Sequence, residues 1–318
     1  MTPTQEAVKK ALAPEIKMQV LPTLANRAGR ARLSFTSWTP ERVSKVVKTA
    51  ADKELGATKT EQKDWTKGGK VLIRPEHLEP MRRLMSEARA YHRAHSLPWY
   101  SADDRILLTK TYQATWKRAM IDFEARHATE RAHIAQEQQN WIDEAQRDMP
   151  PGLFDASAYP ADISARFTMS HSFEPLTKPD QVIDDWRLAR DQDSIDLIVQ
   201  TMQEGSEQAL ETACQDIMTR FTETVGKMRD DLRAFDPNGK GKERGIFRDS
   251  LIENVRGLAD LLPMLNVLGD PRLDDIADRM RQELCAVDAD DLRDSPMECH
   301  SIANAADDIL AAMKGVWA

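Results

Sequence analysis

The sequence has few cysteines, few glycines and no long apolar segment. Its 318 residues include three cysteines, Cys214, Cys285 and Cys299, which are too few and too widely spaced for a disulfide framework, so we expect a reducing compartment. No run approaches the roughly 18 apolar residues of a membrane-spanning helix. The N-terminus lacks the apolar stretch of a signal peptide. These absences predict a cytoplasmic protein that is neither secreted nor inserted in a membrane.

The common catalytic and nucleotide-binding motifs are missing as well. The chain contains no Gly-x-x-x-x-Gly-Lys-Ser/Thr loop, no Gly-x-Gly-x-x-Gly turn, no Gly-x-Ser-x-Gly elbow and no His-Glu-x-x-His helix. We therefore expect no cofactor and no catalytic residues, and we interpret the chain as a non-enzymatic protein.

Two stretches resemble metal sites but lack essential ligands. Residues 236–241 begin like a calcium-binding loop, but Lys240 and Phe247 stand where the loop needs oxygen ligands. Glu124–His127 and Glu130–His133 repeat the Glu-x-x-His spacing of di-metal helix bundles. Those bundles need such pairs on two different helices, whereas these pairs follow one another on one helix and point in different directions. The sequence predicts no metal site.

The charge of the chain is unevenly distributed. Hydrophobic residues make up 41% and charged residues 30%, so the chain is able to bury a core. The net charge is −8, but residues 1–95 hold 19 Lys and Arg against 10 Asp and Glu, a net charge of +9. The remaining residues carry −17. Such a division is typical of a nucleic-acid-binding face, or of two poles that attract each other within or between subunits.

Hydrophobic periodicity predicts a mainly α (α+β) protein with two long helices. The first covers about residues 112–149, and the second runs from about residue 181 or 193 to 235 with apolar residues spaced alternately by three and four. We expect these helices to form a long antiparallel coiled-coil arm. Residues 167–173 alternate apolar and polar side chains and predict a strand within the connection.

Shorter elements flank the arm. Apolar runs predict strands at 32–38, 71–73 and 106–108, and Thr39-Pro40-Glu41 predicts a helix start because these residues suit a cap and a first turn. Gly269-Asp270-Pro271 predicts a joint between two C-terminal helices. The expected domains are a basic N-terminal α+β body with a small antiparallel sheet (1–110), the helical arm (111–236) and a C-terminal helical subdomain (237–318).

The basic N-terminal third offers candidate nucleic-acid contacts. Its arginines flank the predicted strands, and its lysines lie in a polar segment that also contains a tryptophan. In a single-strand-binding surface, cations follow the phosphates and bases stack on aromatic rings. The predicted DNA-binding residues are Arg27, Arg30, Arg32, Lys59, Lys63, Lys67, Lys70, Arg74 and Trp65. The alternative is a basic face that docks on an acidic partner or on a neighbouring subunit.

Several segments resemble a known group of proteins. They are Ser96-Leu97-Pro98-Trp99, Leu153-Phe154, Tyr159-Pro160 and the stretch 246–254, which reads IFRDSLIEN. Together they are similar to a family of uncharacterised proteins encoded by tailed bacteriophages and related mobile elements. The family motifs have no catalytic signature, so the resemblance implies a context and no site residues.

Charge and resemblance together predict two functions. The first is a homo-oligomeric phage accessory protein that contacts single- or double-stranded DNA during replication or recombination, in the cytoplasm of a bacterial host cell. The alternative is a protein–protein interaction module, either an adaptor for an ATPase or an inhibitor of a host defence factor, with a phage or host protein as its partner.

Overall fold

The chain forms two compact units, each built from segments that are far apart in the sequence. Unit 1 comprises residues 1–32, 93–114 and 173–318, and unit 2 comprises residues 33–92 and 115–172. The computed structural model describes residues 20, 23–43, 69–100, 104–149, 154–176, 192–235, 250–288, 292 and 295–317.

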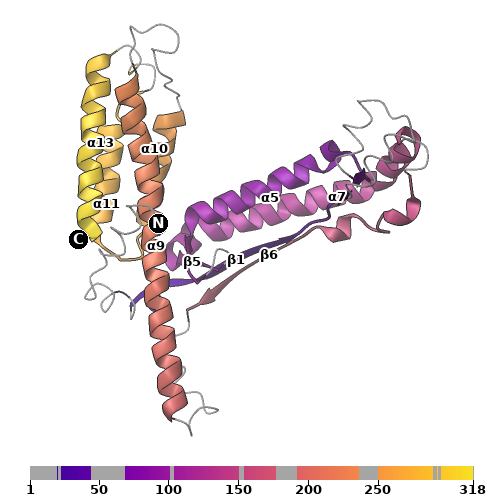
Figure 1. Ribbon diagram of the computed structural model, residues 1–318, viewed down its shortest axis with the longest axis horizontal. Coiled ribbons are helices and arrows are strands. Elements are labelled where there is room, and N and C mark those ends of the chain that lie inside the picture. Colours follow the sequence, from indigo (N-terminus) through magenta and orange to yellow (C-terminus); the bar gives the residue numbers. More distant parts are fainter. Residues whose placement is uncertain are drawn as a thin grey trace. The chain divides into compact units, whose positions relative to one another are not determined.

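Unit 1 contains a bundle of helices around one apolar core. The bundle is formed by α9 (Gln192–Ala234), α10 (Ser250–Leu261), α11 (Pro271–Arg279) and α13 (Pro296–Trp317). Figure 1 shows α13 antiparallel to α9 and beside it, with α10 and α11 completing the bundle. The predicted C-terminal helical region is therefore present.

The partner of α9 differs from the predicted one. The apolar residues of α9 from Ala209 to Leu232 are at most 5% exposed and pack against α13 and α10, whereas the helix predicted at 112–149 belongs to unit 2. Ala303 and Ala306 of α13 are completely buried, and such small residues allow two helices to approach closely. Periodicity identifies the buried face of a helix, but it does not identify the element that covers this face.

The joint before α11 forms as the sequence predicts. Gly269 adopts a positive φ of 69°, Asp270 caps the helix by accepting a hydrogen bond from the Arg272 backbone N–H at 2.9 Å, and Pro271 occupies the first position. The Asn266 side chain accepts hydrogen bonds from the backbone N–H groups of Gly269 and Asp270 at 2.8 and 3.1 Å. These bonds fix the turn that redirects the chain into α11.

A four-stranded antiparallel sheet has the order β4-β5-β1-β6. Its strands are β4 (Leu97–Pro98), β5 (Arg105–Leu108), β1 (Ala28–Thr36) and β6 (Thr168–Pro175). β1 pairs with β5 from Ala28 opposite Leu108 to Ala31 opposite Arg105. A Cβ on Gly29 would lie 2.6 Å from the Glu174 carbonyl oxygen and 2.7 Å from the Phe173 ring. Only glycine fits this position without a shift of its neighbours.

A second sheet contains β2 (Glu41–Val43) and β3 (Gly69–Val71), which pair antiparallel. The predicted helix start at Thr39-Pro40-Glu41 is therefore wrong at its first residues, because Glu41–Val43 form ladder hydrogen bonds with β3 instead. The rest of that predicted helix lies outside the described residues. The strands predicted at 32–38 and 71–73 begin and end two to four residues earlier, at 28–36 and 69–71.

Unit 2 contains most of α5 (Pro75–His95) and all of α7 (Lys117–Asp148), which lie side by side (Figure 1). α6 (Thr109–Thr111) and the π-helical turn η1 (Tyr112–Trp116) precede α7, which confirms the helix predicted at 112–149. Along β6, Met169 and His171 are less exposed than Thr168 and Ser170, as the predicted alternation requires. The core residues of unit 2 are Ile73, Leu78, Met81, Met85, Ile134, Trp141, Ile163 and Phe167.

Candidate functional site

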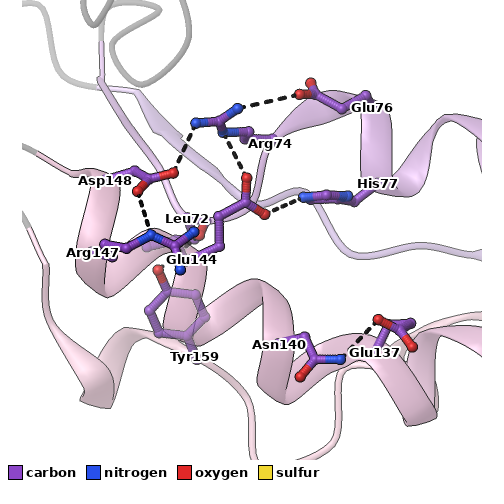
Figure 2. Close-up of polar contacts among 10 residues, drawn as sticks. All are labelled: Leu72, Arg74, Glu76, His77, Glu137, Asn140, Glu144, Arg147, Asp148 and Tyr159. Atoms are coloured by element: carbon purple, nitrogen blue, oxygen red, sulfur yellow. Dashed lines mark hydrogen bonds and ion pairs between the residues drawn. The ribbon is translucent and has the colours of Figure 1, made fainter.

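A charged cluster joins the start of α5 to the end of α7 in unit 2 (Figure 2). We call Arg74, Glu76, His77, Glu144 and Asp148 the Arg74 cluster. Arg74 Nε lies 3.1 Å from Glu144 Oε1, Nη2 lies 3.1 Å from Asp148 Oδ2, and Nη1 lies 3.9 Å from Glu76 Oε1. His77 Nε2 lies 2.6 Å from Glu144 Oε2. Glu144 thus joins the arginine to the histidine.

The local sequence explains this geometry. Arg74 directly precedes Pro75, the first residue of α5, and Glu144 and Asp148 are one turn apart on α7, so both carboxylates face the same direction. The guanidinium also lies near the C-terminal end of α7, where a positive charge is favourable. His77 stacks on Trp141, with ring centroids 4.9 Å apart and planes at 11°. Each charged side chain therefore has a structural partner within the unit.

Tyr159 attaches a third segment to this region. Its hydroxyl donates a hydrogen bond to the Leu72 carbonyl oxygen at 2.7 Å. Burial, together with the nearby Asp155, raises the pKa of Tyr159 to about 12. The phenol therefore stays protonated at neutral pH and serves as a hydrogen-bond donor, not as a general base.

Two arginines in unit 1 cap the C-terminal end of α5. Arg105 donates from Nε to Ser96 Oγ and from Nη2 to the Ser96 carbonyl oxygen, both at 2.7 Å. Arg220 donates to the carbonyl oxygens of Ala94 and Arg93, both at 2.9 Å. Burial and the neighbouring Arg220 charge lower the pKa of Arg105 to about 10. Both guanidiniums satisfy carbonyl groups that the helix itself leaves without partners.

Four predicted DNA-binding arginines contact other groups within the protein. Arg27 donates to the Val267 carbonyl oxygen at 3.0 Å. Arg30 and Arg32 point to Asp104, with Nε–Oδ1 distances of 3.1 and 3.8 Å. Arg74 forms the ion pairs given above. Three of these arginines, Arg30, Arg32 and Arg74, face carboxylates, and Arg27, Arg30 and Arg32 belong to unit 1 whereas Arg74 belongs to unit 2.

The remaining predicted DNA-binding residues are not placed by the structure. Lys59, Lys63, Trp65 and Lys67 lie outside the described residues, and for Lys70 only the backbone, in β3, is described. Trp99, which the sequence places near these charges, is 4% exposed and belongs to the core of unit 1. Its ring is therefore a packing group.

The described residues offer little for covalent or metal chemistry. Burial raises the pKa of each thiol, those of Cys214, Cys285 and Cys299, so the reactive thiolate is disfavoured. No three His, Cys, Asp or Glu side chains among the described residues are grouped so that they could hold a metal ion. A groove of about 640 Å³ between α9 and α10 has Arg93, Arg220 and Lys227 on its walls, but Arg220 is already bonded to α5.

Sequence reasoning missed the Arg74 cluster and the arginine cap of α5. Arg74 and Glu144 are 70 residues apart in the sequence. No local pattern distinguishes them from other distant residues of opposite charge that make no contact. The sequence offers a partial signal for the cluster, because Glu144 and Asp148 lie on the same face of α7 close to its C-terminal end.

Comparisons with known proteins give no function for the chain, so we infer one from its sequence and structure alone. No described helix has both the length and the apolar character that crossing a membrane requires. No family model, no curated protein and no solved structure matches the chain.

Proposed function

We propose that the protein is a non-enzymatic interaction protein and that the first turns of α9 bind a basic, amphipathic segment of another protein. The observation that carries this proposal is the composition of α9. Between Gln192 and Thr219 the helix contains six Asp and Glu and no Lys or Arg, alongside apolar residues at helical spacing.

The apolar residues of α9 are covered unevenly. From Ala209 onward the seam is buried against α13 and α10. Between Asp193 and Glu207 only Ile195 is buried, Ile198 and Met202 are half-buried, and Leu197 is 65% exposed. In Figure 1 these first turns extend beyond α10, α11 and α13. A contiguous exposed apolar patch is typical of an interaction site, and Leu197 with the half-buried Ile198 and Met202 supplies the apolar part of the site that we propose.

The charge on the same turns favours one kind of partner. Asp193, Asp196 and Glu204 are exposed there. A second copy of this acidic helix would bring like charges together, which disfavours self-pairing. A partner helix with leucines on one face and lysines beside them would match both the apolar side chains and the carboxylates. From the resemblance to phage proteins, we propose a phage or host protein as the partner, such as an ATPase or a host defence factor.

The test uses a defined probe. A fluorescent helical peptide of leucine and lysine, titrated with the full chain, should bind with an affinity that falls as salt is added. Replacing Asp193, Asp196 and Glu204 together with lysine should weaken binding at least about tenfold. A matched peptide with glutamate in place of lysine should not bind.

A control variant separates the local from the general effect of charge. Asp275, Asp288 and Glu298 are exposed carboxylates elsewhere in unit 1, and changing these three to lysine alters the net charge equally. The proposal requires the control variant to bind the peptide within about twofold of the wild type. Equal weakening by both triple variants would contradict it.

DNA contact by an oligomeric chain is a second candidate, and the charge of +9 on residues 1–95 favours it. Because Arg27, Arg30, Arg32 and Arg74 contact groups within the protein, the contacts would come from Lys59, Lys63, Trp65, Lys67 and Lys70. Light scattering tests the oligomer, and a monomeric mass at working concentration would contradict this part.

A gel-shift titration at low and high salt tests the DNA contact itself. Binding should be tightest at low salt, and the K59E/K63E/K67E variant should lose it. The matched K110E/K117E/K314E variant, which removes exposed lysines outside the basic region, should keep it. Absence of binding at low salt would rule out this candidate.

A further inference from the structure

His127 of α7 is buried in unit 2, and within the described part of the chain one of its ring nitrogens has no hydrogen-bond partner. The residue is 3% exposed, and its Nε2 atom is buried and has no hydrogen-bond partner among the described residues. Its ring lies 6.2 Å from the ring of Phe35 on β1. A buried polar atom without a partner is unusual in folded proteins and calls for an explanation.

The charged groups around His127 do not favour a positive imidazole. Arg131, one turn along α7, repels a proton on the ring. Glu124 attracts one, but this carboxylate is 61% exposed and lies 3.5 Å from His171 Nε2 of β6. From α5, the Arg89 guanidinium covers the Phe35 ring at 4.9 Å. Burial, with Arg131 as the second cause, lowers the pKa of His127 despite Glu124.

We propose that His127 makes unit 2 sensitive to mild acid, because the packing of α7 against β1 accommodates only the neutral imidazole. Protonation adds a positive N–H group for which the described residues provide no acceptor, and it places a second positive charge beside Arg131. The packing must open to hydrate this group.

The direction of the pH dependence follows from the lowered pKa. The unfolded chain holds the proton at the ordinary histidine value of about 6.5. The stabilisation by the neutral ring is therefore complete above about pH 6.5 and is lost as the pH falls below it. In that range the equilibrium constant for opening rises up to about tenfold for each pH unit.

Hydrogen exchange of the full chain, corrected for the intrinsic exchange rates, measures this opening. Peptides from α7 should have up to about tenfold lower protection at about pH 5.5 than at about pH 7.5. Peptides from α13 in unit 1 serve as an internal reference and should change less. Pepsin digestion after quenching gives both sets in one experiment.

Two variants assign the effect to this residue. His127→Phe keeps an aromatic ring beside Phe35, and it should make the protection of α7 independent of pH over this range. His133→Phe changes an exposed histidine of the same helix and should keep the wild-type dependence. A pH dependence of α7 that persists in His127→Phe, or that is absent in the wild type, would overturn the proposal.

A measurement on the wild type covers the case in which the His127→Phe variant does not fold. The imidazole of His127, followed by NMR, should titrate with a midpoint below about 6.5, together with loss of α7 amide signals. A midpoint at or above 6.5 would overturn the proposal.

Discussion

At the scale of single residues, Glu144 bridges two partners in unit 2. Its two carboxylate oxygens contact Arg74 Nε and His77 Nε2 at 3.1 and 2.6 Å. The side chain is 21% exposed, so water screens these contacts less than it screens a fully exposed pair. A carboxylate that bridges two groups contributes more than a single ion pair, because its removal leaves two donors with weaker partners.

Glu144→Gln keeps the shape of the side chain and removes its charge. We expect it to lower the free energy of unfolding of unit 2 by about 1–2 kcal/mol, since the ion pair with Arg74 and the hydrogen bond with His77 are both weakened. Denaturant unfolding followed by tryptophan fluorescence gives this value, and Trp141, which stacks on His77, is one of the seven reporters. The matched Glu137→Gln change on the same helix weakens the hydrogen bond that Glu137 accepts from Asn140 and should cost less than about 0.5 kcal/mol. Equal losses would remove the special role of Glu144.

At the scale of elements, the two capping arginines give α5 a defined end. The last carbonyl groups of an α-helix have no partners within the helix and carry partial negative charge. Arg105 and Arg220 reach these carbonyls from β5 and α9, so the helix end, the strand and the long helix are joined within unit 1.

Arg220→Met removes the donors of this cap and retains much of the apolar part of the side chain. We expect the free energy of unfolding of unit 1 to fall by about 2 kcal/mol, because charged donors to the Ala94, Arg93 and Ser96 carbonyls are lost. Arg220→Lys should recover only part of this loss, since a single ammonium replaces a planar fork. Thermal unfolding compares the three proteins.

A matched arginine tests whether loss of the helix cap causes the fall in stability expected for Arg220→Met. Arg256 of α10 is exposed and makes a single hydrogen bond of 3.3 Å to the Cys285 carbonyl oxygen. Arg256→Met should change the stability by less than about 0.5 kcal/mol. A loss as large as that of Arg220→Met would indicate a general effect of removing positive charge from an acidic unit.

The elements also show what the sequence alone predicts. The helices around 112–149 and 193–235 and the strand at 167–173 have strong periodicity, and all three form. The start at Thr39-Pro40-Glu41 fails because the same residues also suit an extended strand end once β3 is available for pairing. The Arg74 cluster depends on contacts between distant segments, so neither periodicity nor spacing could have predicted it.

At the scale of the whole molecule, the two units have separate apolar cores. The core of unit 1 lies between α9, α10, α11 and α13 and the neighbouring strands, and the core of unit 2 contains residues of α5 and α7. The two sets of buried residues have no member in common. Separate cores favour separate cooperative opening, even though β1, α5 and β6 pass from one unit into the other.

Core truncations in each unit test this independence. Met81 on α5 and Ile217 on α9 are each 1% exposed, and replacing either with alanine should cost about 2–5 kcal/mol in its own unit. In hydrogen exchange, Met81→Ala should lower the protection of α7 and leave that of α13 nearly unchanged, and Ile217→Ala should do the reverse. If each variant lowered the protection of both helices equally, the chain would open as one cooperative body. The acid response proposed for His127 would then extend to α13, so this pair of variants also decides how far that response spreads.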